Sequence, residues 1–136
     1  MFAAPLFGWA NAAHGYRWTM AILAAELFLP HAGGYFPWTI GRLDVAMGVS
    51  SELKHMKKKP SEYLRRFHYD LITHHPGIMR ALIDLVRVDR IVAGTDFPQG
   101  MAVRNPVDFV ESVPGLIRRE REMILSDNPA RLLKIS

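Results

Sequence analysis

Apolar and polar residues along the chain follow a strand-like alternation in some segments and a helix-like spacing in others. Residues 12–26, rich in Ala, Met and Leu, predict a helix that runs into a short strand at residues 27–29. This strand ends in Pro-His-Ala-Gly-Gly, which predicts a glycine turn. Residues 37–47 predict the next helix, because Pro37 suits the first turn of a helix.

A second strand and helix follow in the middle of the chain. Residues 66–73 (Arg-Phe-His-Tyr-Asp-Leu-Ile-Thr) alternate and are rich in β formers, so they predict a strand. Pro76 then begins a helix. The apolar stripe of this helix, at helical spacing, consists of Ile78, Leu82, Leu85 and Val86.

The last third of the chain repeats the order of strand and helix. Residues 90–93 predict a short strand that is closed by Gly-Thr-Asp-Phe-Pro. Asn105 and Asn128 each stand before a proline, so each is expected to cap a helix that begins there. Between them, residues 116–125 predict a charged helix.

Three strands that alternate with helices indicate an α/β fold with βαβ units and a parallel sheet. Three strands cannot close a barrel, and a complete eight-stranded barrel takes about 250 residues. The chain has 136 residues. The pattern therefore predicts either a small open α/β domain or part of a larger one.

Composition narrows the class of protein. An apolar share of 49% and a charged share of 22% are ordinary for a soluble globular protein. The chain has no cysteine, which excludes disulfides and thiolate metal sites. The longest apolar segment, residues 20–29, is interrupted by Glu26 and is shorter than the roughly 20 residues that span a bilayer. With no signal-peptide pattern at the start, the chain is expected to be cytoplasmic, with no membrane partner.

The net charge of +4 raises the question of a nucleic-acid partner. Much of the excess lies in a basic segment that contains Lys54, Lys57, Lys58, Lys59, Arg65 and Arg66. No aromatic residues interleave with the lysines as a stacking platform for bases would require. A solvated surface is therefore favoured over nucleic-acid binding.

Polar residues stand where each predicted strand ends: His31, the pair His74 and His75, and Asp96. In parallel α/β folds the carboxyl ends of the strands face the active site. His and Asp suit a divalent metal such as zinc, and His also serves as an acid or base near neutral pH. Each residue has an alternative without chemistry: a structural residue before the glycine turn for His31, a helix cap or a simply exposed side chain for His74, and a turn or cap residue for Asp96.

Taken together, four segments resemble motifs of one family. His31–Arg42, Thr73–Pro76 and Gly94–Pro98 resemble the ends of strands six, seven and eight of the aminocarboxymuconate-semialdehyde decarboxylase-like branch of the amidohydrolase superfamily. Asn128–Leu133 resembles the terminal helix of these proteins, and Phe7–Trp9 looks like the segment between strands five and six. The four motifs follow the family's order and cover nearly the whole chain.

The resemblance implies a fold and an activity. The whole chain, residues 1–136, would be the C-terminal portion of a (β/α)8 TIM-type barrel, strands six to eight with their helices, incomplete on its own. The activity would be that of a metal-dependent hydrolase or non-oxidative decarboxylase. The substrate would be a small carboxylated molecule, the reaction would use a metal-activated water, and the metal would be a divalent ion, usually zinc.

The resemblance also implies roles for single residues. Asp96 matches a metal ligand that also accepts a proton from the metal-bound water, and His31 matches the catalytic acid/base beside the metal. Arg42 matches an arginine that pairs with a substrate carboxylate in the neighbouring subunit of a homodimer. Asp70 and His74 are candidates for supporting positions behind these groups.

Some motifs of the family are absent from this sequence. The His-x-His or Glu-x-His motif of strand one and the histidine of strand five are missing, so Asp96 alone remains of the usual four ligands. His14 does not match a strand-end ligand, and His75 replaces the family's usual Asp. A truncated, catalytically inactive homologue without the N-terminal metal-binding half is therefore the alternative to an enzyme.

Overall fold

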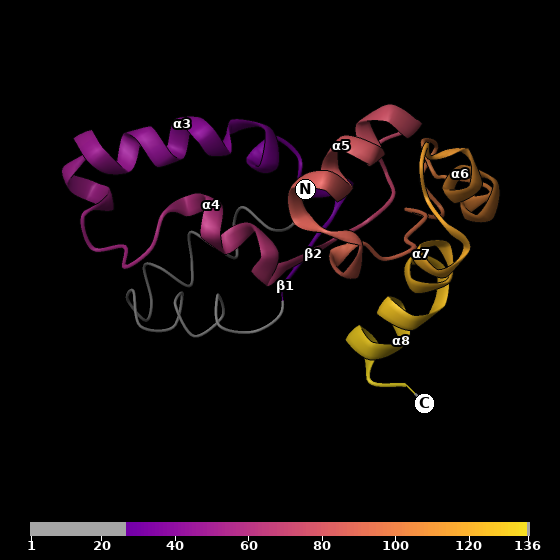
Figure 1. The fold of residues 1–136 in the computed structure, drawn as a ribbon. Coiled ribbons are helices and arrows are strands. Elements are labelled where there is room, and N and C mark those ends of the chain that lie inside the picture. Colours follow the sequence, from indigo (N-terminus) through magenta and orange to yellow (C-terminus); the bar gives the residue numbers. More distant parts are fainter. Residues whose placement is uncertain (1–26, 136) are drawn as a thin grey trace.

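The structure is a computed structural model that describes residues 27–135 of the chain. These residues form an α/β unit whose centre consists of β1 (Leu27–Leu29), β2 (Phe67–Tyr69) and α5 (Pro76–Val86). On one side of this centre lie α3 (Phe36–Val49) and α4 (Pro60–Tyr63), and on the other α6 (Pro106–Ser112), α7 (Arg118–Glu122) and α8 (Asn128–Leu133) (Figure 1). The helix expected at residues 12–26, together with Phe7–Trp9 and His14, lies outside the described residues. The α/β prediction is confirmed for the rest.

The sheet is parallel but smaller than expected. β1 (Leu27–Leu29) pairs with β2 (Phe67–Tyr69), and Leu29 stands opposite Tyr69. Tyr69 in turn meets Ile91 in an isolated parallel bridge. The predicted strand at residues 90–93 is therefore wrong beyond this bridge. After Val92 donates its N–H to the Tyr69 carbonyl, the next N–H, that of Ala93, leaves the sheet and donates to the Ile124 carbonyl.

β2 is also shorter than the predicted strand at residues 66–73. Arg66 belongs to a 3₁₀ turn (Leu64–Arg66), and the strand stops at Tyr69. Asp70 ends it, because the Asp70 carboxylate accepts the N–H of Ile72 at 3.0 Å and so turns the chain. Side-chain bonds of this kind compete with sheet pairing, and sequence alternation does not report them.

Three helix starts that the sequence predicts are confirmed. Pro37 lies in the first turn of α3, Pro76 begins α5, and the Asn105 side chain accepts the N–H of Asp108 at the start of α6. The α-helices are α3 (Phe36–Val49), α4 (Pro60–Tyr63), α5 (Pro76–Val86), α6 (Pro106–Ser112), α7 (Arg118–Glu122) and α8 (Asn128–Leu133). Short 3₁₀ turns lie at His31–Gly33, Ser51–Leu53, Leu64–Arg66 and Val88–Arg90.

The core lies between the sheet and α5. The buried face of α5 consists of Met79, Leu82, Ile83 and Val86. Leu82 and Val86 are buried as predicted, whereas Ile78 is 44% exposed and the predicted stripe omits Met79 and Ile83. The face packs in one cluster that also contains Tyr69, Leu71, Ile91, Val110 and Ile124.

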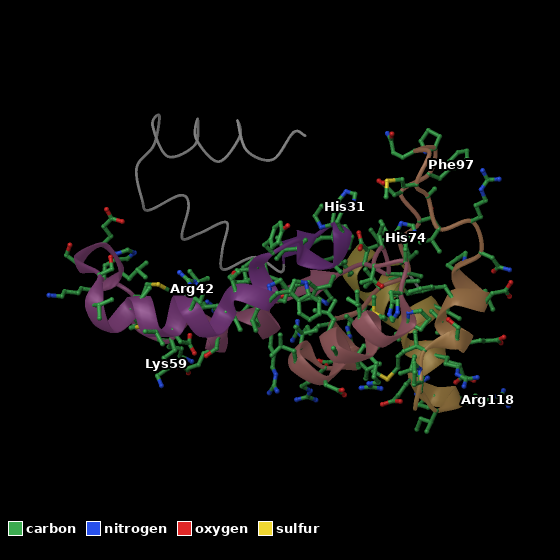
Figure 2. The ribbon with its side chains drawn as sticks, turned by 90° about the horizontal axis from the view of Figure 1, so that it is seen from above. His31, Arg42, Lys59, His74, Phe97 and Arg118 are labelled. Carbon is green, nitrogen blue, oxygen red and sulfur yellow. The ribbon has the colours of Figure 1, made fainter. Side chains whose placement is uncertain are left out.

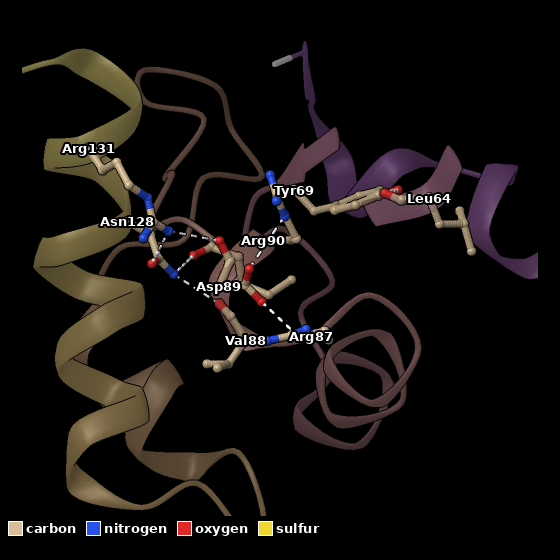
Figure 3. Close-up of polar contacts among 9 residues, drawn as sticks. Leu64, Tyr69, Arg87, Val88, Asp89, Arg90, Asn128 and Arg131 are labelled. Atoms are coloured by element: carbon tan, nitrogen blue, oxygen red, sulfur yellow. Dashed lines mark hydrogen bonds and ion pairs between the residues drawn. The ribbon is translucent and has the colours of Figure 1, made fainter. Parts of the chain in front are cut away.

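Asn128 has a different role from the predicted one. A π-helical turn (Met123–Asp127) joins α7 to α8, so Asn128 has helical backbone angles and caps nothing. Its buried side chain instead donates to the carbonyls of Val88 and Ile91 at 2.9 and 2.8 Å. The Asn128 Oδ1 accepts from Arg131, which also reaches the Asp89 carbonyl (Figure 3). This side chain therefore clamps α8 to residues 88–91, the segment that leads into the isolated bridge at Ile91.

The structure bears on two expectations, one about the basic segment and one about a membrane span. Lys54, Lys57, Lys58, Lys59, Arg65 and Arg66 are all exposed, as expected for a solvated basic segment. Within residues 27–135, no helix combines the length and apolarity needed to cross a membrane. The absence of a nucleic-acid partner and the cytoplasmic location stay predictions.

Candidate functional site

The loops with the candidate residues gather at one edge of the sheet. Leu29, Tyr69 and Ile91 stand side by side in parallel register, so the segments that follow them leave in the same direction. Figure 2 shows His31, His74 and Phe97, the neighbour of Asp96, along one edge of the molecule. The structure therefore brings together the three strand ends, as the sequence predicts.

The first loop is a left-handed turn. His31, Ala32, Gly33 and Gly34 have φ values of 54°, 53°, 79° and 57°. Residues other than glycine rarely adopt such angles, so the turn needs support. The Asp70 carboxylate provides it, because it accepts the N–H of His31 and the N–H of Ala32, each at 2.8 Å. The backbone of His31 is thus fixed, while its side chain lies exposed.

Tyr69 forms the floor of this turn. Its side chain is fully buried, and its hydroxyl donates to the Leu64 carbonyl at 2.9 Å (Figure 3). Burial raises the pKa of the Tyr69 phenol above its usual range. A methyl group at Gly33 would lie only 2.8 Å from the Cε1 atom of the Tyr69 ring. The turn can therefore rest on the ring only because position 33 is glycine.

In the second loop His75, and not His74, is the structural residue. His75 Nδ1 accepts the N–H groups of Gly77 and Ile78 at 3.2 and 3.3 Å and so caps α5. His74 has a φ of 52° and is exposed. Within residues 27–135 the His74 side chain makes no hydrogen bond or ion pair. The alternative that His74 caps the helix is wrong, because its neighbour does so, and the alternative of an exposed side chain agrees with the structure.

In the third loop the Asp96 side chain, like that of His74, is not the one that holds the turn. Asp96 has a φ of 61° and is partly exposed. The turn is held by Thr95 Oγ1, which accepts the N–H of Phe97, and by the Asp96 carbonyl, which accepts the N–H of Gln99. In the described part of the chain nothing donates to the Asp96 carboxylate. Asp96 is therefore not the turn-capping residue of the structural alternative.

The three loops share one arrangement. In each of them the side chain of another residue accepts the backbone N–H groups of the loop, and His31, His74 or Asp96 adopts a left-handed backbone conformation. Left-handed angles at residues other than glycine cluster at functional sites. Two imidazoles and a carboxylate at one edge can move protons or bind a cation.

The described residues do not supply a complete metal site. Within residues 27–135, no group of three or more His, Asp or Glu side chains lies close enough together to hold an ion. Catalytic zinc sites typically use three protein ligands. Asp96 would therefore be one ligand among others that these residues do not provide.

A cavity next to Asp96 contains a residue that the sequence reasoning missed. The cavity has a volume of about 560 Å³, is lined mainly by residues 97–104 and also touches Thr95. Arg104 is the one charged residue in this lining. A signal existed in the sequence, since Arg104 stands between the strand-end motif and the Asn105 helix cap. Arg42 instead lies along α3, exposed and away from His31 (Figure 2).

Comparison with known proteins supports the resemblance seen in the motifs. No family model matches the chain. Two curated relatives are both named 2-amino-3-carboxymuconate-6-semialdehyde decarboxylase. The relative from Dictyostelium discoideum is 28% identical over 105 residues, which are 76% of this chain and 29% of that protein. The relative from Caenorhabditis elegans is 29% identical over 112 residues, 81% of this chain and 28% of that protein. The chain thus spans less than a third of the length of either relative.

Solved structures show where the fold recurs. The 5-carboxyvanillate decarboxylase LigW from Sphingomonas paucimobilis superposes with a TM-score of 0.71 and 26% identity, over 82% of this chain and 34% of that one. A dihydroxybenzoic acid decarboxylase from Polaromonas sp. JS666, solved with bound manganese and the inhibitor 2-nitroresorcinol, has a TM-score of 0.66. It is 22% identical over 80% of this chain and 33% of that one. The described α/β unit is therefore a substructure of larger decarboxylase folds.

Proposed function

Because this chain is a relative of the aminocarboxymuconate-semialdehyde decarboxylase-like proteins of the amidohydrolase superfamily, we propose that it forms part of a metal-dependent decarboxylase or hydrolase. The substrate class is a small carboxylated molecule. Within this proposal the chain contributes strands six to eight of a TIM-type barrel, and its candidate edge is the mouth of that barrel.

One observation carries the proposal. At the three strand ends His31, His74 and Asp96 are left without side-chain hydrogen bonds in the described chain, while Asp70, His75 and Thr95 make the bonds that shape the loops. A purely structural role would use the carboxylate or the imidazoles themselves as caps. Polar side chains that the fold holds in place but does not use are suited to a ligand or a reacting group.

The residues take different roles. His31 is the proposed acid/base, because its imidazole is exposed at the candidate edge and its backbone is fixed. Asp96 is the proposed ligand of a divalent ion, with zinc the preferred one. The remaining ligands would come from residues outside 27–135 or from another chain. His74 is proposed to support these groups at the same edge.

Two arginines are candidates for the substrate carboxylate. Arg42 lies along α3 and is proposed to act across a homodimer interface on the site of the neighbouring subunit. Arg104 lies in the cavity beside Asp96 and would act in its own subunit. A planar guanidinium can bind a carboxylate with two parallel hydrogen bonds, which suits either position.

The proposal is tested on this chain assembled with the polypeptide that supplies the remaining metal ligands, loaded with zinc or manganese. Release of CO₂ from 5-carboxyvanillate and from 2-amino-3-carboxymuconate-6-semialdehyde is measured, with the metal content determined by elemental analysis. We expect stoichiometric metal and metal-dependent turnover. A folded assembly that retains no metal and releases no CO₂ from either compound would favour the alternative, a catalytically inactive homologue.

Subunit mixing separates the two arginines. His31→Ala is expected to lower kcat about 10²- to 10⁴-fold while metal stays bound, because a positioned acid or base contributes that much. Arg42→Ala is expected mainly to raise KM, because it removes binding of the anion. A mixture of the two variants should regain part of the activity, since one site of the mixed dimer has both groups.

The matched comparison is Arg104→Ala mixed with His31→Ala. If Arg104 acts in its own subunit, this mixture stays inactive, because every site lacks one of the two groups. If the His31 and Arg42 variants form mixed dimers that stay inactive, Arg42 does not act across the subunit interface.

A further inference from the structure

We propose that Asp70 is a positioning residue that holds the His31 turn and so fixes where the His31 imidazole projects. Asp70 follows β2, and its carboxylate reaches across to the turn that follows β1. Oδ2 accepts the N–H of His31 at 2.8 Å, and Oδ1 accepts the N–H of Ala32 at 2.8 Å. Successive backbone N–H groups of this kind form a concave nest for an anion. In this turn the anion is a side chain of the protein itself.

The contact lies at the junction of the three loops. Asp70 is 1% exposed, and its Oδ1 also accepts the N–H of Ile72, in its own loop, at 3.0 Å. On the side of the third loop, a methyl group at Gly94 would lie 3.1 Å from the Asp70 Cβ atom. Gly94 stands two residues before Asp96. Asp70 therefore sets the position of the His31 turn relative to the loop that carries Asp96.

The His31 turn depends on this contact for its shape. His31 and Ala32 have φ values of 54° and 53°, which side-chain-bearing residues rarely adopt. Hydrogen bonds to an ionised carboxylate are stronger than those between neutral groups, so two of them can hold the left-handed backbone. The benefit for proton transfer rests on the proposed function, whereas the positioning itself does not.

Asp70→Asn tests the role with almost no change of shape. An amide keeps one acceptor oxygen and replaces the other with an NH₂ donor. Because Oδ1 accepts two amides and Oδ2 accepts one, the oxygen is expected to stay with Ala32 and Ile72. The NH₂ group then faces the N–H of His31. We expect hydrogen exchange at the His31 amide to become about 10- to 100-fold faster, the loss expected for a charge-assisted bond.

The matched control is Asp44→Asn. Asp44 also accepts a backbone amide, that of Ser61 at 2.9 Å, but it does so between α3 and α4. This variant should speed exchange at Ser61 and leave His31 unchanged. In Asp70→Asn the imidazole NMR signals of His31 should shift, while those of His75, which caps α5, should not. A general loss of structure would move both histidines.

Unchanged exchange at His31 in Asp70→Asn would overturn the proposal, as would equal acceleration in the Asp44 control. If Asp70→Asn does not fold, Ala32→Gly is added, because glycine adopts left-handed angles without steric cost. The double variant should fold and keep fast exchange at His31. A double variant that stays unfolded, or that protects His31 as the wild type does, would also refute the role. If the chain shows the expected exchange but its assembly with the polypeptide that supplies the remaining ligands binds no metal and releases no CO₂, this role is kept and the proposed function is lost.

Discussion

Replacing Asp96 by alanine or asparagine is expected to lower both metal affinity and turnover at least about 100-fold, because even a partner of a metal ligand is typically worth 10- to 100-fold. The asparagine variant is the sharper of the two. Asparagine tolerates left-handed angles better than alanine, so it should preserve the loop at a φ of 61°. A neutral amide is nevertheless a weaker ligand than a carboxylate for a divalent ion. The readouts are metal content by elemental analysis and CO₂ release.

The control for Asp96 is Asp108→Asn. Asp108 is an exposed carboxylate in the first turn of α6, and it has no part in the proposed site. This variant should keep both metal and activity. Wild-type metal content together with wild-type turnover in Asp96→Asn would remove Asp96 from the proposed metal site.

Gly33→Ala is expected to destabilise the fold by about 2–5 kcal/mol, the sum of a left-handed backbone cost and overpacking against a buried ring. The φ of Gly33 is 79°, and the new methyl group would lie 2.8 Å from the Tyr69 ring. The ring cannot retreat easily, because Tyr69 is fully buried and its hydroxyl is bonded to Leu64. Urea unfolding followed by circular dichroism measures the loss.

Gly34→Ala separates the two causes of this loss. Gly34 has a φ of 57°, but a methyl group there would meet nothing within 4 Å. The ψ of Gly34 is −129°, outside the left-handed α region, so this variant should lose only a backbone contribution of about 1–3 kcal/mol. Equal losses in the two variants would mean that the contact with Tyr69 does not restrict position 33.

The features that the sequence predicts correctly are those that depend on near neighbours. Pro37, Pro76 and Asn105 begin helices because a proline or a cap acts within its own turn. The strand-end motifs likewise place His31 and Asp96 at one edge, since parallel strands end together.

The features that the sequence does not predict depend on distant partners. The third strand shrinks to one bridge because Ala93 bonds to Ile124, thirty-one residues later in the chain. Asn128 has the pattern of a cap but is buried against Val88 and Ile91. In the candidate site, Asp70 is expected behind the reacting groups, but its bonds to the His31 turn follow only from the structure. Arg104 is seen only once the loop folds around its cavity.

The clamp formed by Asn128 has a consequence for the chemical ageing of the protein. Asparagine side chains deamidate when the backbone nitrogen of the next residue attacks the amide carbon, and this attack requires an N–H. Asn128 and Asn105 are both followed by proline, which has no N–H. Conversion of Asn128 to aspartate would replace a donor by a buried carboxylate facing the carbonyls of Val88 and Ile91. The residue that follows Asn128 blocks this route, so the amide that joins α8 to the core is expected to outlast ordinary asparagines.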